Sequence, residues 1–254
     1  MKFIASDFDG TIHYRDGIAQ NVRDALTHWQ SLGNKFGIVS GRGIQNLTYS
    51  VKYEELKCDY LVANNGAVIA DGDGNPLKYH TGDPACIMEV AAFVLQYDTR
   101  YLCVNDLGDE VFICTKERKE LRYKDDDRFV VIDEFTDIKP FTQLSTVCRD
   151  VDLAVELTNL LNEKFAGKVT ALRNGYCIDI VPYGVTKATG VEDMLAVFGG
   201  SHDDVATVGD NSNDYDMIKA FRGYAVANAI DSIKEIATCV VADLAELVEK
   251  ELKA

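Results

Sequence analysis

Short apolar runs alternate with helical patterns over the first third of the chain. In chain order, the runs and the helical patterns between them lie at residues 2–6, 21–33, 35–40, 43–56 and 59–66. The first helical pattern places apolar residues on one face, with Asn21 as the candidate N-cap and Gly33 as the stop. This βαβαβ order predicts a parallel sheet. The apolar runs lack polar alternation, as expected where helices cover both faces of the sheet.

The same rhythm returns after about residue 183, but the pattern between the two blocks differs. Two helical patterns lie there among strand-like pieces, at 85–97 and 150–165 for the helices and at 101–105, 110–116, 128–133, 143–149 and 176–182 for the strands. This order is typical of α+β structure, with an antiparallel sheet and helices on one face. We therefore predict a doubly wound, Rossmann-like α/β core at 1–81 and 183–254, interrupted by an inserted α+β domain at 82–182.

Composition restricts the ligands and the location. The 26 basic and 41 acidic residues give a net charge of −15, which repels nucleic acids and anionic membrane surfaces. An anionic ligand must then be held by local positive groups, and a bound divalent cation is one source of them. No apolar run approaches the roughly 20 residues that span a bilayer, and the N-terminal apolar stretch is too short for a signal peptide. We expect a cytoplasmic protein.

The cysteines and histidines do not predict a metal site. The seven cysteines are odd in number and never form a CxxC pair, which indicates reduced, mostly buried thiols rather than a zinc ribbon or a disulfide framework. His28, His80 and His202 lack the spacing of metal ligands. The charged run at 116–128 is interpreted as a solvated loop or helix face.

Polar side chains follow four of the predicted core strands. They are Asp7, Ser40 with Gly41 and Arg42, Asn64 with Asn65, and Asp210 with Asn213 and Asp214. Asp, Gly and Thr are ordinary turn residues, so the DFDGT stretch at 7–11 is by itself consistent with a plain turn. Ligands of an open parallel sheet bind outside the carboxyl ends of its strands. Three such ends that carry carboxylates or a hydroxyl predict a convergent site.

The residue types at these strand ends suit metal-assisted phosphoryl transfer. Asp7 and Asp210 can share Mg²⁺, which prefers a few carboxylate oxygens together with waters and a substrate phosphate. The other oxygen of Asp7 is then available as a nucleophile, since carboxylates form aspartyl-phosphates. Asp9 can give a proton to the leaving oxygen and later take one from the hydrolytic water.

Phosphoryl transfer also needs hydrogen-bond donors and positive charge around the phosphoryl oxygens. Ser40 and the backbone N–H groups of Gly41 and Arg42, at the start of a predicted helix, form a candidate cradle. Lys187 starts another predicted helix and is the candidate cation, although a lysine taken alone is usually a surface side chain.

Four short motifs together resemble the haloacid dehalogenase superfamily. In order and spacing they are DFDGT at 7–11, VSGR at 39–42, VTK at 185–187 and GDNSND at 209–214. The insertion between NNGA at 64–67 and the lysine motif looks like the C2-type (C2B) cap of the Cof-like sugar-phosphate phosphatases. In that group the second motif more often reads TGR, and an Asp-Gly-Val stretch after the last core strand is usual but has no counterpart here.

The resemblance implies a role for each matching residue. Asp7 would be the nucleophile and a metal ligand, Asp9 the acid/base with its backbone carbonyl on the metal, and Asp210 a metal ligand. Asp214 would support the metal and its waters, with help from Asn213. The phosphate-binding residues would be Ser40, Gly41, Lys187 and Asn213. The acid at position 9 separates phosphatases from dehalogenases in the superfamily, so dehalogenation is not expected.

The inserted domain is interpreted as a lid that excludes water and selects the leaving group. Candidate substrate contacts are Arg42, Asn65, Arg173 and Asn174. Arg42 suits a salt bridge to the core equally well, and Arg173 and Asn174 suit an ordinary hairpin tip. His13 and Tyr14 are expected to shape the loop after the nucleophile rather than to react.

These features predict a Mg²⁺-dependent phosphatase that hydrolyses a small phosphomonoester, a sugar or polyol phosphate, through an aspartyl-phosphate. We expect a monomer or a small homo-oligomer.

Two alternative functions stay open. A phosphosugar mutase of the phosphomannomutase type would carry a glycine-rich GGSD where this chain has VSGR. A non-catalytic regulator that binds a phosphometabolite would be expected to lose the nucleophile or the acid, and this chain has both.

Overall fold

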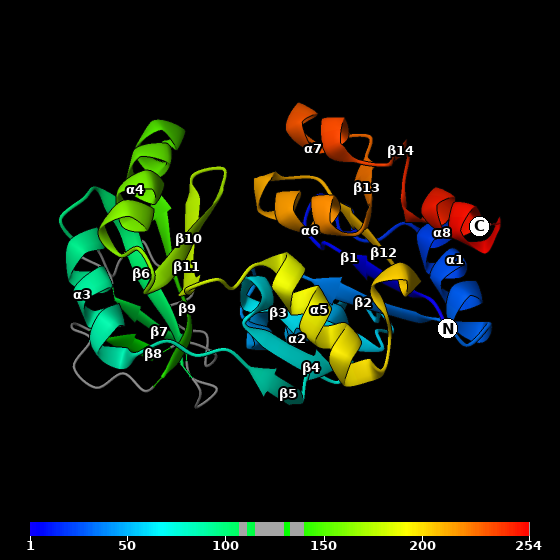
Figure 1. Ribbon diagram of the computed structural model, residues 1–254, viewed down its shortest axis with the longest axis horizontal. Coiled ribbons are helices and arrows are strands. Elements are labelled where there is room, and N and C mark those ends of the chain that lie inside the picture. The colour runs from blue at the N-terminus through cyan, green and yellow to red at the C-terminus, as the bar shows by residue number, and fades with distance from the viewer. Residues whose placement is uncertain (107–110, 115–129, 133–139, 254) are drawn as a thin grey trace. The chain divides into compact units, whose positions relative to one another are not determined.

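The computed structural model describes residues 1–106, 111–114, 130–132 and 140–253. Contacts divide the chain into two compact units, Met1–Lys78 with Thr186–Ala254, and Tyr79–Val185 (Figure 1). The charged run at 116–128, for which the sequence predicts a solvated loop or helix face, lies outside the described residues.

In the described chain, the first unit is built on one sheet of eight strands. These are β1 (Phe3–Ser6), β2 (Lys35–Val39), β3 (Tyr60–Ala63), β4 (Val68–Asp71), β5 (Pro76–Tyr79), β12 (Val205–Gly209), β13 (Arg222–Val226) and β14 (Cys239–Val241). Their order in the sheet is β14-β13-β12-β1-β2-β3-β4-β5, with parallel pairing from β14 to β3 and antiparallel pairing of β3 with β4. Strands β1, β3 and β12 contain only buried residues, which explains their lack of polar alternation.

Helices pack around this sheet as the α/β prediction requires. They are α1 (Gln20–Ser31), α2 (Ile44–Tyr53), α5 (Lys187–Phe198), α6 (Tyr215–Ala220), α7 (Asp231–Ile236) and α8 (Leu244–Lys253), with short 3₁₀ turns at η1 (Asn64–Gly66), η3 (His202–Asp204) and η4 (Ser212–Asp214). Helix α5 packs on β2, β3 and β4 and contacts α6, whereas α1 packs on β2 and contacts α8 (Figure 1). One hydrophobic core, which includes the fully buried Trp29, joins these layers.

The predicted start of the first helix is wrong. Helix α1 begins at Gln20, and its N-cap is Ala19, whose side chain makes no capping hydrogen bond. Asn21 lies in the first turn, where its amide donates to the carboxylate of Asp243 at 2.7 Å. The Asn21 side chain therefore bonds to a residue distant in the sequence instead of capping the helix. The predicted stop is confirmed, since Gly33 follows the last turn with a φ of 81°.

The second unit is an α+β structure. Its described elements are α3 (Pro84–Val94), β6 (Thr99–Asp106), β7 (Val111–Cys114), β8 (Val130–Ile132), β9 (Phe141–Cys148), α4 (Val151–Lys164), β10 (Val169–Asn174) and β11 (Cys177–Pro182). The strands form one sheet in the order β10-β11-β9-β6-β7-β8. The buried side chains at alternate positions Leu102 and Val104 of β6 and Ile178 and Ile180 of β11 join buried residues of α3 and α4 in a second hydrophobic core.

The sequence missed three strands and one pairing direction. Strands β4, β5 and β10 have no counterpart among the predicted segments. Among the described strands of the second unit, neighbours pair antiparallel except β7 and β8, which pair parallel, so the predicted antiparallel pairing is wrong for that pair.

All seven cysteines are free thiols. Burial, with a contribution from the Asp179 charge, raises the pKa of Cys103 to about 12 and that of Cys177 to about 11, so these thiols stay protonated at neutral pH. No helix within the described ranges is long and apolar enough to cross a membrane.

Candidate active site

The two acids that the sequence assigns to the metal follow neighbouring parallel strands. Ser6 at the end of β1 is in register with Val208 of β12, and the backbone N–H of Asp7 donates to the carbonyl of Val208 at 2.9 Å. Asp210 comes directly after β12. One carboxylate oxygen each of Asp7, Asp210 and Asp214 lies within 4.8 Å of the others. The sheet thus brings together acids that are about 200 positions apart in the chain.

Lys187 lies among these acids. It is the first residue of α5, and its side chain is fully buried. Its Nζ donates to Asp7 Oδ1 at 2.6 Å and to Asp214 Oδ1 at 2.5 Å. The Thr186 hydroxyl caps the helix by accepting a hydrogen bond from the backbone N–H of Thr189. This cap fixes the first turn of α5, from which the Lys187 side chain extends. The surface position that a lysine usually takes is therefore excluded.

The site carries more negative than positive charge. Burial is the largest cause of the raised pKa of Asp7; Lys187 opposes the shift, while Asp214 and Asp210 add to it. Burial and the Asp214 charge likewise raise the pKa of Asp210. Burial would lower the pKa of Lys187, but the two carboxylates outweigh it and hold that pKa above its usual value. Lys187 is within ion-pair distance of both Asp7 and Asp214, so a single ammonium group offsets only part of the charge of the three acids.

This imbalance fits a divalent cation. Three carboxylates face one ammonium group, so a further positive charge would relieve their mutual repulsion. The donors are all hard carboxylate oxygens, the ligands that Mg²⁺ prefers.

Thr11 is a site residue to which sequence reasoning assigned no role. Its buried hydroxyl lies 3.2 Å from Asp7 Oδ2 and 3.1 Å from Asp210 Oδ1, and can donate to one of them at a time. Asp214 is fixed in turn, since its Oδ2 accepts from the backbone N–H groups of Asp210 and Asn211, both at 2.9 Å. The only signal for Thr11 in the sequence is its place in DFDGT.

Hydrogen bonds link the predicted phosphate-binding residues of the neighbouring strand ends. Ser40 is buried at the end of β2, and its hydroxyl accepts from the N–H of Arg42 at 3.2 Å across the half-buried Gly41. The N–H of Asn65 donates to the carbonyl of Ser40 at 3.0 Å, and the Asn65 side chain accepts from the Asn213 amide at 3.3 Å. The structure thus connects Ser40 with Asn213 through Asn65, a candidate substrate contact, at the carboxyl ends of β2, β3 and β12.

Asp9 is placed differently from the three clustered acids. Its side chain is 50% exposed, and its two oxygens accept from Nε and Nη2 of Arg42, both at 2.6 Å. The salt bridge that the sequence allowed for Arg42 is present, with Asp9 as its partner, and its contact with a substrate stays a prediction.

The remaining two candidates lie in the second unit. Arg173 and Asn174 end β10, and Arg173 donates to the carbonyl of Gly175 at 3.0 Å within the hairpin. Their contact with a substrate stays a prediction.

Residues 4–246 match the family model described as haloacid dehalogenase-like hydrolase. The chain therefore belongs to this family, which confirms the resemblance that its four motifs carry. It is a phosphatase of that family, an enzyme of the phosphoric monoester hydrolase class, as the sequence predicts.

Named relatives span nearly the whole chain. A Bacillus subtilis protein named 5-amino-6-(5-phospho-D-ribitylamino)uracil phosphatase is 22% identical and covers 92% of this chain and 89% of its own. An HMP-PP phosphatase of Yersinia pseudotuberculosis is 24% identical over 92% and 86% of the two chains. The solved structure of a HAD subclass IIB sugar phosphatase has a TM-score of 0.79 at 20% identity, over 100% of this chain and 98% of that one. This likeness confirms the predicted fold class.

Proposed function

We propose that this phosphatase is Mg²⁺-dependent and hydrolyses a small sugar or polyol phosphate through an aspartyl-phosphate on Asp7. The observation that carries the proposal is the cluster of Asp7, Asp210 and Asp214, in which the buried Asp7 and Asp214 contact the ammonium of Lys187. A nucleophilic carboxylate, a fixed cation and an excess of negative charge that suits a divalent ion are the parts that phosphoryl transfer requires.

The ion would be held by the carboxylates of Asp7 and Asp210 and by the backbone carbonyl of Asp9. Asp214 would support the metal and its waters. When bound, Mg²⁺ would neutralise charge on the phosphoryl oxygens and orient the phosphate. Ser40, the N–H of Gly41, Lys187 and Asn213 are the proposed partners of the phosphoryl group.

In the first step, a carboxylate oxygen of Asp7 forms a bond to phosphorus as the bond from phosphorus to the ester oxygen breaks. Asp9 gives its proton to the departing oxygen, which leaves as an alcohol. Lys187 offsets negative charge that spreads over the phosphoryl oxygens.

In the second step, water attacks the phosphorus of the aspartyl-phosphate. Asp9, now ionised, takes the proton of that water, the bond between phosphorus and the Asp7 oxygen breaks, and phosphate leaves. Asp7 is then free again, and the proton taken from water replaces the one that Asp9 gave to the leaving alcohol.

A phosphorylated polyol is part of the name of one relative, which supports a polyol or sugar phosphate as the substrate here. We further propose that residues 82–182 act as the lid that selects the leaving group, with Arg173 and Asn174 among its contacts. The cytoplasmic location and the monomer or small homo-oligomer stay predictions.

The test measures phosphate release from sugar, polyol, nucleotide and cofactor phosphates, with Mg²⁺ and with EDTA. We expect turnover with Mg²⁺, loss of turnover in EDTA, and loss in Asp7→Asn by about 10⁴-fold or more, because removal of a covalent nucleophile costs on that scale. The matched control is Asp203→Asn, since Asp203 is fully exposed on η3 and should leave the rate unchanged.

Wild-type turnover that survives in Asp7→Asn would exclude the aspartyl-phosphate. Equal rates with Mg²⁺ and EDTA would exclude the metal. A strong preference for nucleotide or cofactor phosphates would exclude the substrate class.

A further inference from the structure

The predicted acid, Asp9, begins a series of neighbouring ionisable side chains that the proposed mechanism does not use. Its Oδ1 lies 3.7 Å from Nδ1 of His13, and Nε2 of the same imidazole lies 3.4 Å from Oε1 of Glu54. The Glu54 side chain is only 11% exposed. The histidine therefore lies between the exposed acid and a nearly buried carboxylate.

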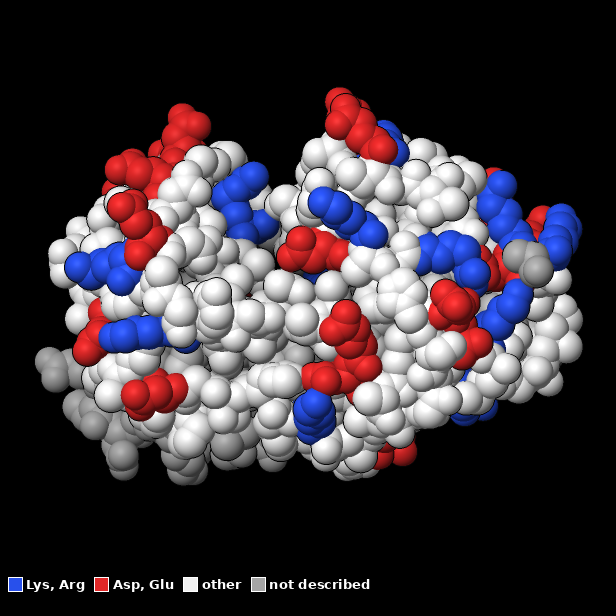
Figure 2. Space-filling view, viewed as in Figure 1, with Lys and Arg blue, Asp and Glu red and all other residues white. Residues whose placement is uncertain are grey.

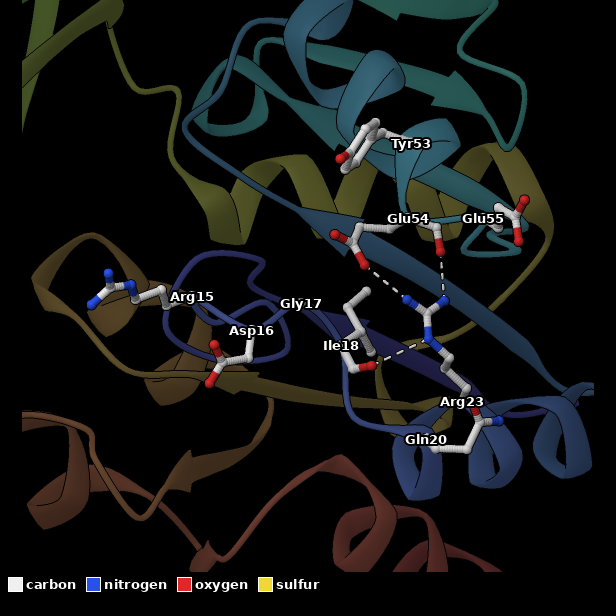
Figure 3. A pocket seen from close by; sticks show the side chains of 9 residues that line it. All are labelled: Arg15, Asp16, Gly17, Ile18, Gln20, Arg23, Tyr53, Glu54 and Glu55. Atoms are coloured by element: carbon white, nitrogen blue, oxygen red, sulfur yellow. Dashed lines mark hydrogen bonds and ion pairs between the residues drawn. The ribbon is translucent and has the colours of Figure 1, made fainter.

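Arg23 fixes Glu54 in turn. Its Nη2 donates to Glu54 Oε2 at 2.8 Å, its Nη1 donates to the carbonyl of Glu54 at 2.5 Å, and its Nε donates to the carbonyl of Ile18 at 3.2 Å. Figure 3 shows these bonds at the edge of a pocket of about 780 Å³, which Glu54 and Arg23 help to line. With three guanidinium nitrogens engaged, Arg23 leaves the Glu54 carboxylate little freedom to turn away from His13.

The imidazole is also held from its face and through its backbone. Its ring stacks on Phe8, with centroids 4.8 Å apart and an angle of 6° between the planes. The N–H of His13 donates to the carbonyl of Phe8 at 2.9 Å, and the carbonyl of His13 accepts from Gly10 at 3.0 Å. The ring is thus fixed by Phe8 on its face and by Glu54 at its far nitrogen.

The state of Asp9 explains why such a fixed neighbour matters. In this structure both Asp9 oxygens accept from Arg42, whereas a general acid presents a protonated oxygen to the leaving group. Asp9 is therefore expected to leave the guanidinium in order to react, and His13 is the other side chain that the described ion-pair contacts place beside it.

We propose that His13 is a positioning residue for Asp9, held in place by Glu54 and Arg23. It keeps the Asp9 carboxyl near the leaving oxygen once Arg42 releases it. This role rests on the proposed function, since it assumes that Asp9 serves as the general acid.

The experiment compares an alkyl phosphate, glycerol phosphate, with p-nitrophenyl phosphate as paired substrates and measures kcat/KM, which includes the departure of the leaving group. An alkoxide needs a proton to leave, whereas nitrophenolate leaves without one, so loss of a well-placed acid slows only the alkyl ester. His13→Phe keeps the ring stack and lacks both nitrogens. We expect it to lower kcat/KM at least about ten-fold more for the alkyl ester than for p-nitrophenyl phosphate, because a general acid contributes about 10²-fold or more and misplacing it loses part of that effect.

Two further variants test the mechanism of positioning. His13→Asn keeps a nitrogen at the position of Nδ1 and should restore most of the lost selectivity, and Glu54→Gln should lose part of it. The control is His28→Phe, because His28 is exposed on α1 and should not change the ratio of the two rates.

Equal losses for the two esters in His13→Phe, or no loss, would overturn the role of His13 and leave the proposed function standing. The same holds if His13→Asn is as impaired as His13→Phe. A wild type that releases phosphate from neither ester would overturn the proposed function and the role of His13 together.

Discussion

A single residue, Lys187, places a positive charge among the clustered acids of the candidate active site. Its fully buried ammonium contacts Asp7 and Asp214, and each of those side chains is at most 8% exposed. Removing one member of a buried ion pair leaves an uncompensated charge in a poorly solvated place. The lysine is therefore expected to serve both the fold and the reaction.

We predict that Lys187→Met lowers the free energy of unfolding by about 3–5 kcal/mol in the absence of metal, the range for breaking a buried pair from one side. Urea denaturation in EDTA measures this value. Adding Asp214→Asn should recover part of the loss, because it removes one of the stranded charges. Lys52→Met on the exposed side of α2 is the control, with a change within about 0.5 kcal/mol. If Lys187→Met leaves the free energy of unfolding unchanged, the acids are neutral in the metal-free protein and form no ion pairs with Lys187.

At the scale of elements, the position of Lys187 depends on how closely α5 approaches the sheet. A Cβ added at Gly190 would lie 2.5 Å from Cα of Gly66 and 2.7 Å from Cγ1 of Val62. Atoms at these distances clash, so α5 reaches β3 and η1 only because residue 190 has no side chain. Lys187 lies one turn earlier on the same helix, and its distance to the acids follows from this contact.

We predict that Gly190→Ala destabilises the protein by about 1–3 kcal/mol through overpacking, offset in part by the roughly 1 kcal/mol better helix propensity of alanine. It should also lower kcat/KM several-fold, since α5 must move away from the sheet together with Lys187. Phosphate release and thermal unfolding measure the two effects.

Gly199→Ala is the matched control on the same helix. Gly199 ends α5 with a φ of 73° and has open space around its Cβ position. Gly199→Ala should lower the free energy of unfolding by about 1–2 kcal/mol, because alanine is strained in the left-handed backbone conformation, and should leave the rate unchanged. Equal rates for the two variants would show that helix packing does not position Lys187.

At the scale of the whole molecule, the two units have separate hydrophobic cores. The core of the first unit includes Trp29, the single tryptophan of the chain, and the core of the second includes Leu157 and Leu161 of α4. Separate cores can unfold separately, because few of the stabilising contacts of one core belong to the other.

We predict that Leu157→Ala lowers the stability of the second unit by about 2–5 kcal/mol, the usual cost of a buried leucine, and leaves that of the first unchanged. In urea, Trp29 fluorescence should keep its midpoint while the circular dichroism signal gains an earlier transition. A common shift of both signals would show that the two units unfold as one.

The sequence by itself determined the α/β class, the α+β insertion and the order of the active-site motifs. These follow from local periodicity and from residues placed directly after apolar runs, so neighbours along the chain are enough to read them. Tertiary structure alone decided that Lys187 is buried, that Arg42 pairs with Asp9, and that β7 runs parallel to β8. It also decided that His13 lies between Asp9 and Glu54. Each of these depends on at least one contact between side chains or strands that are not neighbours in the sequence, such as that of His13 with Glu54, and no periodicity encodes such a contact.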